Sequence, residues 1–417
     1  MKILVIGNGG REHTLIWKLK QCSAVSHLYC APGNPGIGHL ADCVNLNPDQ
    51  VQELRDFAIE KQIDLTVVGP EVPLVAGIID EFRQEGLQIV GPDKAGARLE
   101  GSKSFAKAFM KKYQIPTGQY EVAYSGDEAR EKLAKFDYPV VVKADGLAAG
   151  KGVLICHTEK EALQAIDDIL ENRVFGEAGS HLVLEEFLTG TETSVLCFVD
   201  GETILPMASS QDHKQIGDGD TGPNTGGMGT YSPNRVYTET IAKEVNRHIL
   251  IPTLKGIQAE KMDFRGILFI GLMITEQGAK VLEYNVRFGD PETQVVLPRL
   301  KTDLCHIFME MLNRNLEDLV LEWKQETAVC VVLASGGYPG SYQKGYPIYG
   351  LDSLPPEVTV FHAGTALDGS QLVTAGGRVL GVTALGKDVH EAREKAYLAV
   401  DQIDFEGKTY RRDIGLR

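Results

Sequence analysis

The sequence lacks the apolar stretches that a membrane protein needs. No run of apolar residues approaches the roughly 18 that a transmembrane helix requires. Met1–Ile6 leads directly into a glycine turn and is too short for the apolar core of a signal peptide. These absences predict a cytoplasmic protein with no membrane partner.

Paired cysteine motifs are also missing. The seven cysteines stand far apart, and none belongs to a C-x-x-C pair. This spacing argues against a zinc ribbon and against a disulfide scaffold, and an odd number of cysteines suits a reducing cytosol. A single catalytic thiol stays an open alternative, although no cysteine has an obvious partner in the sequence.

The chain has no excess of basic residues. Its formal net charge is −15 and its pI is about 5.2. Because proteins that bind a nucleic-acid backbone usually present a basic face, this charge argues against nucleic acid as a partner. A local basic cleft for a small anion remains compatible with it. The 417 residues are enough for two to four domains.

The chain begins with a strand, a glycine turn and a helix. Residues 2–6 are apolar, and Gly7-Asn-Gly-Gly-Arg-Glu-His13 leads into a helical pattern that continues to Lys20. A dinucleotide fingerprint would need a third glycine at position 12, where Glu12 stands, so a nicotinamide cofactor is disfavoured. Arg11 favours a single phosphate or carboxylate, while a tight turn without a ligand is an equal alternative.

Further alternation of strands and helices extends this start into an open parallel sheet. The pattern places strands near residues 27–30, 64–68 and 87–90. Glu71 follows the second of these at its carboxyl end, where open α/β sheets bind ligands. It either contacts a substrate or charges the first turn of a helix. Residues 1–101 are therefore predicted to form one Rossmann-like domain.

The most informative stretch is Tyr138–Gly152. A strand at residues 140–142 ends in Lys143, and a glycine-rich loop precedes a second strand at residues 153–156. The loop is no Walker A motif, which would need Ser or Thr at position 152 and a helix after it. Glycines free the backbone N–H groups to face a phosphate, so a flap over a nucleotide is favoured over a solvated hairpin. Lys103, in the first turn of an earlier helix capped by Ser102, either indicates a nearby anion or is an exposed lysine without functional meaning.

Two later segments carry polar side chains into otherwise apolar or irregular sequence. The strand at residues 181–188 contains two acids; as a hinge, its backbone would pair with an adenine edge, but the residues alone favour a charged edge strand. Residues 211–229 read as one long polar, glycine-rich loop, which suits a polar small molecule better than disorder.

A second predicted strand carries metal-ligand chemistry. Alternation along residues 280–288 places Glu283, Asn285 and Arg287 on one face. The other face then carries the apolar set Leu282, Tyr284, Val286 and Phe288. Hard oxygen ligands at positions i and i+2 suit Mg²⁺ carrying nucleotide phosphates, and the guanidinium would stabilise a transferring phosphoryl group.

The chain restarts after Glu326 as a small α/β unit. Strands are expected near residues 330–333, 358–362 and 378–383, before a helix at residues 390–401. The closing segment Tyr410-Arg-Arg-Asp-Ile-Gly415 is either a solvated basic tail or a lid on a phosphate, and the sequence does not separate these readings.

Together these motifs resemble the phosphoribosylamine–glycine ligases, a family of the ATP-grasp superfamily. The glycine turn at residues 7–13, the flap, the loop at residues 211–229 and Arg287-Phe-Gly-Asp-Pro-Glu292 occur in that family's order, and the resemblance spans essentially the whole chain. It implies an ATP-dependent ligase of de novo purine biosynthesis. Such an enzyme joins glycine to 5-phosphoribosylamine through a glycyl phosphate and releases ADP and phosphate.

The resemblance also implies the architecture. The fold class is mixed α/β and α+β, with an N-terminal parallel-sheet domain at residues 1–101 and a small C-terminal α/β domain at residues 327–417. A two-lobed ATP-grasp core at residues 102–326 lies between them, with the flap lobe at about residues 119–188. The implied partners are ATP, glycine and 5-phosphoribosylamine with Mg²⁺ or Mn²⁺, and we expect a monomer.

Site residues are carried over by position. For ATP the resemblance implies Lys103, Lys143, Gly146, Gly150, Lys151, Gly152, Glu185, Glu186, Leu188 and Glu192, with the last on the ribose. For the metal it implies Glu283 and Asn285, and for catalysis Arg287, Asp212 and Lys214. For the other substrates it implies Gly9, Gly10, Arg11, Glu71, Thr225, Gly226, Gly227 and Asp290.

The sequence departs from the ATP-grasp pattern at one strand, and two other functions are alternatives to the ligase. Many ATP-grasp proteins offer another metal carboxylate on the preceding strand, but residues 269–274 contain none, which leaves the number of metal ions open. A different ATP-grasp ligase or carboxylase is the nearer rival. A nicotinamide-dependent oxidoreductase is the remote one, opposed by Glu12.

Overall fold

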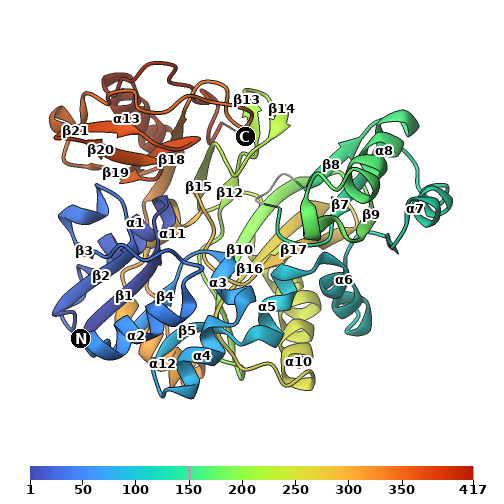
Figure 1. Cartoon of the computed structure of the whole chain (residues 1–417), viewed down its shortest axis with the longest axis horizontal. Helices are drawn as coiled ribbons and strands as arrows, with labels where there is room; N and C mark the ends of the chain where they lie inside the picture. Colours follow the sequence, from blue (N-terminus) through green and yellow to red (C-terminus); the bar gives the residue numbers. More distant parts are fainter. Residues whose placement is uncertain (149–151, 417) are drawn as a thin grey trace.

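The computed structural model describes residues 1–148 and 152–416, which form an N-terminal part, a central part, a smaller lobe and a C-terminal part (Figure 1). These four parts surround a cleft. The N-terminal part is the predicted parallel sheet, in the order β3-β2-β1-β4-β5. Its strands are β1 (Lys2–Gly7), β2 (His27–Pro32), β3 (Asp42–Cys43), β4 (Leu65–Val68) and β5 (Ile89–Pro92). Its helices are α1 (Gly10–Leu19), α2 (Val51–Lys61), α3 (Glu71–Ala76), α4 (Ile78–Gln84) and α5 (Lys94–Gly101).

This sheet continues into the central part of the molecule. Phe264 and Arg265 of β16 pair with the end of β5, so one nine-stranded sheet runs through both parts. The central strands are β10 (Thr191–Val199), β11 (Ile204–Pro206), β16 (Phe264–Thr275) and β17 (Gly278–Asn285). The central helices are α9 (Glu239–Val245), the π-helical turn η4 (Asn246–Leu250), α10 (Ile251–Ala259), α11 (Thr293–Arg299) and α12 (Leu304–Leu312).

A smaller lobe projects from the other side of the cleft. Helix α6 (Lys103–Lys112) leads into it, and the side chain of Ser102 caps this helix by accepting from Phe105 N–H, as predicted. The lobe contains β6 (Tyr120–Ala123), α7 (Gly126–Leu133), β7 (Val140–Ala144), β8 (Val153–Cys156), α8 (Glu159–Ile166) and β9 (Leu182–Glu186).

Strand β9 has a different position from the one its acidic residues suggested. The sheet order is β6-β9-β7-β8, so β9 has a neighbour on both sides. The edge-strand interpretation is therefore wrong. The charge of Glu185 is tolerated inside the sheet because two lysines meet its carboxylate.

The expected long loop at residues 211–229 is largely strand. Its elements are β12 (Gln211–Asp212), β13 (Gln215–Gly217), β14 (Thr221–Asn224) and β15 (Gly229–Ser232). Strands β13 and β14 pair with each other as an antiparallel hairpin, and β12 pairs with β15. Because this segment alternates polar residues with glycines, no apolar periodicity marked its strands.

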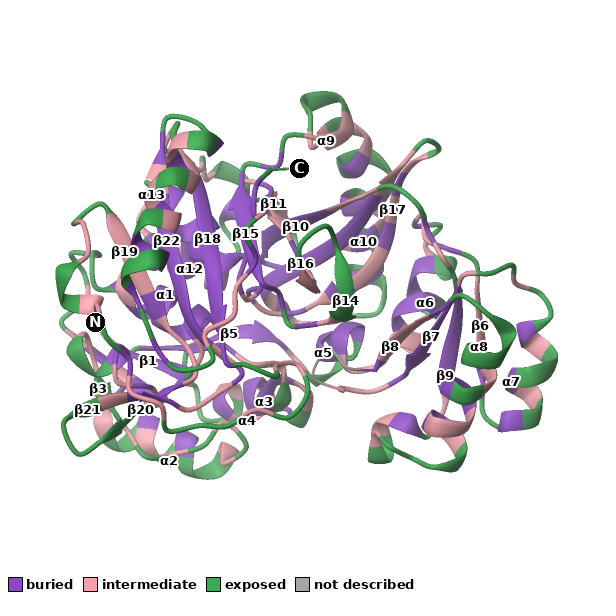
Figure 2. Ribbon diagram, turned by 90° about the horizontal axis from the view of Figure 1, so that it is seen from above, coloured by how far each residue is buried: buried purple, intermediate pink, exposed green. Residues whose placement is uncertain are grey.

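The C-terminal part is an antiparallel sheet covered by one long helix. The sheet contains β18 (Thr327–Ala334), β19 (Val358–His362) and β22 (Arg378–Gly386), and the helix is α13 (Val389–Gln402). Strands β20 (Thr365–Asp368) and β21 (Gln371–Thr374) form a separate antiparallel hairpin. The sheet order β12-β15-β18-β22-β19 includes two strands from the central part. Figure 2 shows the buried strands of this sheet beneath the partly exposed helix.

The alternation predicted along β17 breaks at one residue. A register shift against β16 leaves Leu282 without a partner, between the pairs Gly271–Glu283 and Leu272–Val281. This β-bulge turns Leu282 toward the cleft, while Val281 and Tyr284 are buried in the core. Placing Leu282 on the core face was therefore wrong, whereas Glu283 and Asn285 line the cleft as predicted.

Within the described chain, no helix is both long and apolar enough to cross a membrane.

Candidate active site

A cavity of about 600 Å³ lies in the cleft and is lined by all four parts of the molecule. Most predicted site residues that the structure describes line this cavity: Gly9, Arg11, Glu71, Lys103, Lys143, Gly152, Glu185, Glu186, Leu188, Glu192, Asp212, Lys214, Thr225, Gly226, Glu283, Asn285, Arg287 and Asp290. Gly10, Gly146 and Gly227 are adjacent to lining residues without lining it themselves. Gly150 and Lys151 lie outside the described residues.

One end of the cavity carries a surplus of positive charge. Glu185 is buried, with Lys107 bonded to its Oε1 and Lys143 paired with its Oε2. Apart from this ion pair with Lys143, the buried Glu185 Oε2 accepts no hydrogen bond from the described residues. Lys103 donates to the carbonyl of Gly146 over 3.1 Å. Three ammonium groups against one carboxylate make this end suited to an anion.

Burial sets the charge state of two of these lysines. It lowers the pKa of Lys107 to about 8, in spite of the attraction of Glu185. It also lowers the pKa of Lys103, helped by the charge of Lys143. A bound anion would reverse both shifts, because a nearby negative charge favours the protonated amine.

An apolar slot adjoins the lysines. Its walls include Val141, Ile155, Leu188, Met273 and the bulge residue Leu282. Glu185 lies inside the β-ladder, between Tyr120 of β6 and Val141 of β7, whereas β9 ends at Glu186. The backbone N–H and C=O groups after Glu186 therefore lie next to the slot and are not used by the β-ladder.

Glu283 and Asn285 present oxygen ligands beside the lysines. The Glu283 carboxylate is 3.8 Å from Lys214 Nζ, and Asn285 Oδ1 accepts from Arg287 Nη2 over 3.1 Å. Burial opposes the charge of Glu283, but Lys214, Lys143, Lys103 and Arg287 together outweigh it and hold its pKa below the usual value. An ionised carboxylate and an amide oxygen at positions i and i+2 fit a hard divalent cation. Phe269, the partner of Asn285 on β16, adds no ligand.

The other end of the cavity is acidic. Burial raises the pKa of Asp212, and the charge of Glu292 raises it further. Burial likewise raises the pKa of Glu292, whose Oε1 accepts from Ser194 Oγ. The nearby Lys214 is 3.3 Å from Glu192, and the surrounding carboxylates raise its pKa. Such a mixed cluster suits a ligand that carries both charges, as an amino acid does.

Arg287 joins the central part to the N-terminal part. Its guanidinium pairs with Glu100 at 2.7 Å and with Glu71 at 3.5 Å. Glu100 also accepts from Val286 N–H over 2.7 Å, which fixes the backbone after β17. Glu71 is thus an ion-pair partner of a predicted catalytic residue, and its pKa is lowered because Arg287 and Arg11 outweigh burial.

The glycine turn before α1 is filled by the protein's own side chains. Glu12 accepts from Gly9 N–H over 2.6 Å and from Arg11 Nε over 2.6 Å. Asp290 accepts from Arg11 N–H over 3.1 Å. A Cβ at Gly69 would meet the Glu12 carboxylate at 1.9 Å, so the space between β1 and β4 holds this carboxylate and nothing larger. The structure therefore excludes a dinucleotide pyrophosphate here, as Glu12 predicted.

The segment Thr225–Gly227 is held from two directions. Thr225 donates to the Lys214 carbonyl, and Arg378 donates to the Gly226 carbonyl over 2.6 Å. Gly227 has φ 111°, and a Cβ there would lie 2.7 Å from the Asp212 carboxylate, so only glycine fits.

The whole chain matches one family of known proteins. Models of the phosphoribosylglycinamide synthetase N domain, ATP-grasp (A) domain and C domain match residues 1–100, 101–293 and 328–417. The chain belongs to the phosphoribosylglycinamide synthetase family. The resemblance stated from the motifs is thereby confirmed, and so is the ATP-grasp fold class.

Relatives agree over their full length. Phosphoribosylamine–glycine ligases of Clostridium acetobutylicum and Halalkalibacterium halodurans are 51% and 50% identical, over 100% of this chain and 99% and 96% of theirs. The crystal structure of the Thermotoga maritima phosphoribosylamine–glycine ligase is 36% identical with a TM-score of 0.86, over 100% of both chains. Biotin carboxylase of Campylobacter jejuni shares the fold at 13% identity and a TM-score of 0.76, over 98% of this chain and 92% of that one.

Four cavity residues of this family member escaped the sequence reading: Lys107, Glu100, Glu292 and Arg378. Glu292 ends the motif that begins at Arg287, so its position next to Asp290 was a usable signal. Lys107 lies one helical turn after Lys103, on the same face of α6, which was a second signal. Arg378 reaches the cavity from the C-terminal sheet, and nothing local in the sequence indicates this.

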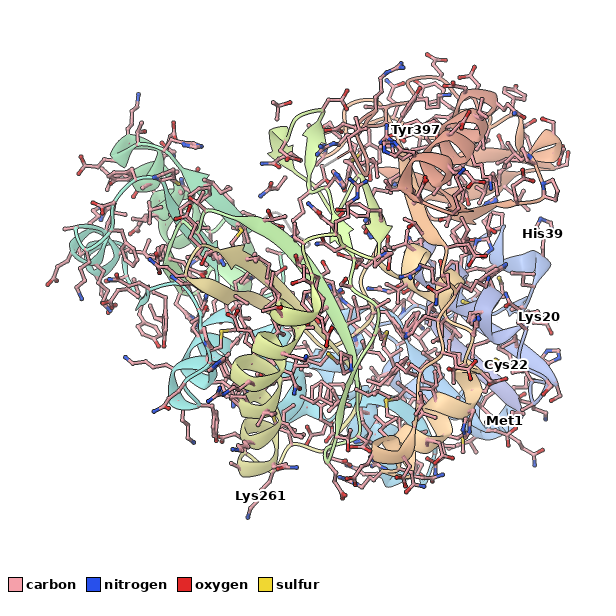
Figure 3. All side chains as sticks on the ribbon, turned by 180° about the vertical axis from the view of Figure 1, so that it is seen from behind. Met1, Lys20, Cys22, His39, Lys261 and Tyr397 are labelled. Carbon is pink, nitrogen blue, oxygen red and sulfur yellow. The ribbon has the colours of Figure 1, made fainter. Side chains whose placement is uncertain are left out.

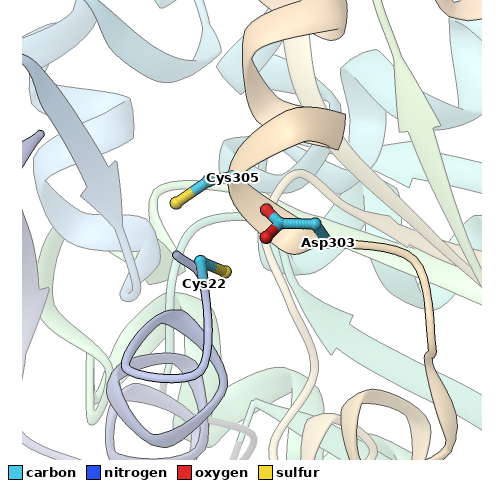
Figure 4. Close-up of side chains that lie close together, drawn as sticks. All are labelled: Cys22, Asp303 and Cys305. Carbon is cyan, nitrogen blue, oxygen red and sulfur yellow. The ribbon is translucent and has the colours of Figure 1, made fainter. Parts of the chain in front are cut away.

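A separate group of possible metal ligands lies far from the cavity. Donor atoms of Cys22, Asp303 and Cys305 are within 4.8 Å of one another (Figure 4). They lie beyond the C-terminal end of α1, where Figure 3 labels Cys22 close to Met1 and Lys20, whereas the cavity is at the N-terminal end of α1. Three donors fall short of the usual four of a closed site, and the buried Lys18 is a nearby competing cation.

Proposed function

We propose that this cavity joins glycine to 5-phosphoribosylamine, with ATP cleaved to ADP and phosphate. Family membership makes the chain an ADP-forming ligase of de novo purine biosynthesis, with small-molecule substrates, ATP and a divalent metal ion. The observation that carries the proposal is the adjacency, in one cavity, of the lysine-rich end, the Glu283–Asn285 ligand pair and the acidic cluster around Lys214.

ATP lies across the lysine-rich end in this proposal. Lys103 and Lys143 contact its phosphates, and the flap residues Gly146, Gly150, Lys151 and Gly152 close over them. The adenine fills the apolar slot and pairs with backbone beyond Glu186, toward Leu188, while Glu192 binds the ribose. Glu185 contributes its carboxylate, which positions Lys107 and Lys143.

Glu283 and Asn285 hold the metal ion, which we propose to be Mg²⁺ or Mn²⁺. When bound, such an ion offsets charge on the nucleotide phosphates. Arg287, fixed by Glu100 and Glu71, directs its guanidinium at the transferring phosphoryl group.

The chemistry has two steps. A carboxylate oxygen of glycine attacks the γ-phosphorus of ATP, the bond from that phosphorus to ADP breaks, and glycyl phosphate forms. The amine of phosphoribosylamine then attacks the carbonyl carbon, the bond to phosphate breaks, and an amide remains. The proton lost by the amine passes to the acidic cluster around Asp212. No protein nucleophile takes part, and closure of the flap keeps water from the acyl phosphate.

The remaining substrate contacts follow from the geometry of the acidic end. Asp212, Lys214 and the segment Thr225–Gly227 bind glycine and the amine, with Asp290 beside them. Gly9, Gly10 and Arg11 form the floor toward the N-terminal part. The N–H groups of Gly9 and Arg11 already donate to Glu12 and Asp290, so these residues contribute the shape of the floor rather than hydrogen-bond donors.

The proposal also covers the domain boundaries, the location and the oligomeric state of the enzyme. The domains span residues 1–101, 102–326 and 327–417, and the enzyme acts as a cytoplasmic monomer. Its Cys residues take no part in catalysis.

The test is ADP release from Mg²⁺-ATP and glycine, with and without freshly generated phosphoribosylamine. The proposal requires ADP in quantity only with both substrates, matched by the amide product. Turnover with bicarbonate in place of the two substrates would instead favour a carboxylase.

A further inference from the structure

The last residues of the chain return to the substrate side of the cleft. After α13, the segment Tyr410–Gly415 runs back to the β13–β14 hairpin, and the C-terminus lies beside this hairpin (Figure 1). Neither reading offered by the sequence describes it. The segment is no solvated tail, because Arg411 is completely buried, and no phosphate lid, because protein acceptors take its guanidinium.

Arg411 binds the hairpin and the tail at once. Its Nη1 donates to Asp220 Oδ1 over 2.8 Å and to the Gln215 carbonyl over 3.1 Å. Its Nε and Nη2 each donate to the Asp413 carboxylate over 2.7 Å. A buried guanidinium is tolerated only with such complete pairing, and this bidentate geometry fixes direction as well as charge.

Backbone contacts add to this connection between residues 411–413 and residues 215–220, which we call the joint. Gly219 N–H donates to Asp413 Oδ2 over 2.9 Å, and Arg412 N–H donates to Asp218 Oδ1 over 2.8 Å. The turn between β13 and β14 is therefore attached to residues 411–413 at several points.

The hairpin connects this joint to the reaction. Lys214 immediately precedes β13, Asn224 is the last residue of β14, and Thr225 follows it; all three line the cavity. The tail also reaches the residue between the two catalytic ones, since Gly415 N–H faces His213 Nε2 at 3.5 Å. Arg411 itself does not line the cavity.

We propose that Arg411 is a positioning residue for this ligase: it fixes the β13–β14 hairpin so that Lys214 and Thr225 meet the substrates. The inference rests on the proposed function and deepens it, because it assigns the carboxyl-terminal segment to the substrate end of the site. A small displacement of positioned groups is costly to catalysis even far from the chemistry.

The experiment compares three variants of the full chain. Arg411→Met removes the joint, Asp220→Asn weakens only its hairpin half and leaves the Arg411–Asp413 pair, and Arg412→Met is the matched control. Arg412 is the adjacent arginine, but its side chain is exposed and lies over the Tyr410 ring. Steady-state constants for glycine and phosphoribosylamine, ATP dissociation constants and hydrogen exchange of residues 215–224 are measured for each.

The expected results separate positioning from general stability. Arg411→Met should lower kcat/KM for glycine and phosphoribosylamine by about 10-fold or more, and Asp220→Asn by a smaller factor, consistent with displaced catalytic groups. ATP dissociation constants should change by a clearly smaller factor, since Lys103 and Lys143, which contact the phosphates, are not attached to the hairpin, although Lys214 pairs with Glu192 and Glu283. Hydrogen exchange in the hairpin should rise in both variants and stay unchanged in Arg412→Met.

Three outcomes would overturn the proposal. One is normal kinetics in a folded Asp220→Asn enzyme whose hairpin exchanges faster; this variant also decides the matter if Arg411→Met does not fold. The second is an equal loss of ATP and glycine affinity, which would indicate general destabilisation. If the unmodified enzyme failed to couple ATP to glycine, the proposed function would fall, while unchanged hairpin exchange in Arg411→Met, the third outcome, would separately disprove the joint.

Discussion

The turn before α1 and the strand β17 carry similar residues but differ in whether their polar groups are already bonded within the same segment. Each brings an arginine and a glutamate to the cavity next to glycine-rich or strand-end backbone. In the turn, the Glu12 carboxylate accepts hydrogen bonds from Gly9 N–H and Arg11 Nε, both of which belong to the same short segment. On β17, in contrast, Glu283 and Asn285 meet side chains of other residues: Lys214 Nζ is 3.8 Å from the Glu283 carboxylate, and Arg287 Nη2 donates to Asn285 Oδ1 over 3.1 Å.

The difference shows what separates a ligand site from a motif that resembles one. A polar group bonded to its own backbone has no bonding capacity left for a ligand. A carboxylate kept ionised by surrounding ammonium groups retains that capacity. Substitutions in the two regions should therefore affect different properties, turnover in β17 and stability in the turn.

Glu283→Gln should have the largest effect. Loss of the charged ligand removes the metal contact, and we expect turnover to fall by about 100-fold or more, on the scale of removing one preorganised transition-state contact. Steady-state ADP release measures this, and circular dichroism checks the fold. Near-normal rates with Mg²⁺ would disprove the metal assignment and with it the contrast to the turn.

Asp212→Asn should come next. Its carboxylate belongs to the acidic cluster, so the coupled reaction should slow by about 10- to 100-fold, as for a displaced acid–base group. ATP affinity, measured by titration with a fluorescent nucleotide, should change little. A selective loss of nucleotide affinity would contradict the assignment of this residue to the substrate end.

Glu12→Gln should have the opposite result, a loss of stability with little loss of turnover. A neutral amide still caps Gly9 but loses the ion pair with Arg11, at a cost of about 1–3 kcal/mol of unfolding free energy. Turnover should stay within a few-fold of the original. Urea unfolding measures the first and ADP release the second, with Glu53→Gln, on an exposed face of α2, as control. A loss of turnover as large as that of Glu283→Gln would mean that the turn is itself a ligand site.

Removal of one buried histidine should have the smallest effect, a change in the pH dependence of stability. Burial lowers the pKa of His13 to about 3, helped by His362, whose own pKa burial lowers to about 4. Between pH 4 and 6.5 the unfolded chain binds protons that the folded chain does not. Stability should therefore fall as the pH drops through this range, by up to about 1.4 kcal/mol per pH unit for each histidine.

His13→Gln isolates this contribution. Urea unfolding at pH 7.0 and pH 5.5 should show a weaker fall in stability for this variant than for the original protein. An equal fall in both would show that His13 is accessible to protons in the folded state, and that the turn is less completely filled than the structure indicates.

Local sequence signals were sufficient for the elements whose residues depend on near neighbours. The flap strands were predicted because Val140–Val142 and Val153–Cys156 are short apolar runs bounded by glycine and proline, and the structure has β8 at those same residues. The ligand pair on β17 was visible because carboxylate and amide interrupt an otherwise apolar strand.

Other features depend on contacts that no local pattern contains. Strand β9 is internal only because β6 and β7 flank it, and Leu282 faces the cleft only because β16 pairs with a one-residue slip. Arg378 and Arg411 reach the substrate end because the C-terminal sheet takes β12 and β15 as its own strands. Such docking is set by the packing of distant segments, and it needs coordinates.

The central claim is that the carboxyl group of glycine is activated as glycyl phosphate in this cavity. The direct test is a single reaction with glycine labelled with ¹⁸O in its carboxylate, followed by mass analysis of the phosphate released. If glycyl phosphate forms, one ¹⁸O atom passes from each glycine to the phosphate, because the attacking oxygen leaves with phosphorus. Unlabelled phosphate formed together with the amide product would contradict the account.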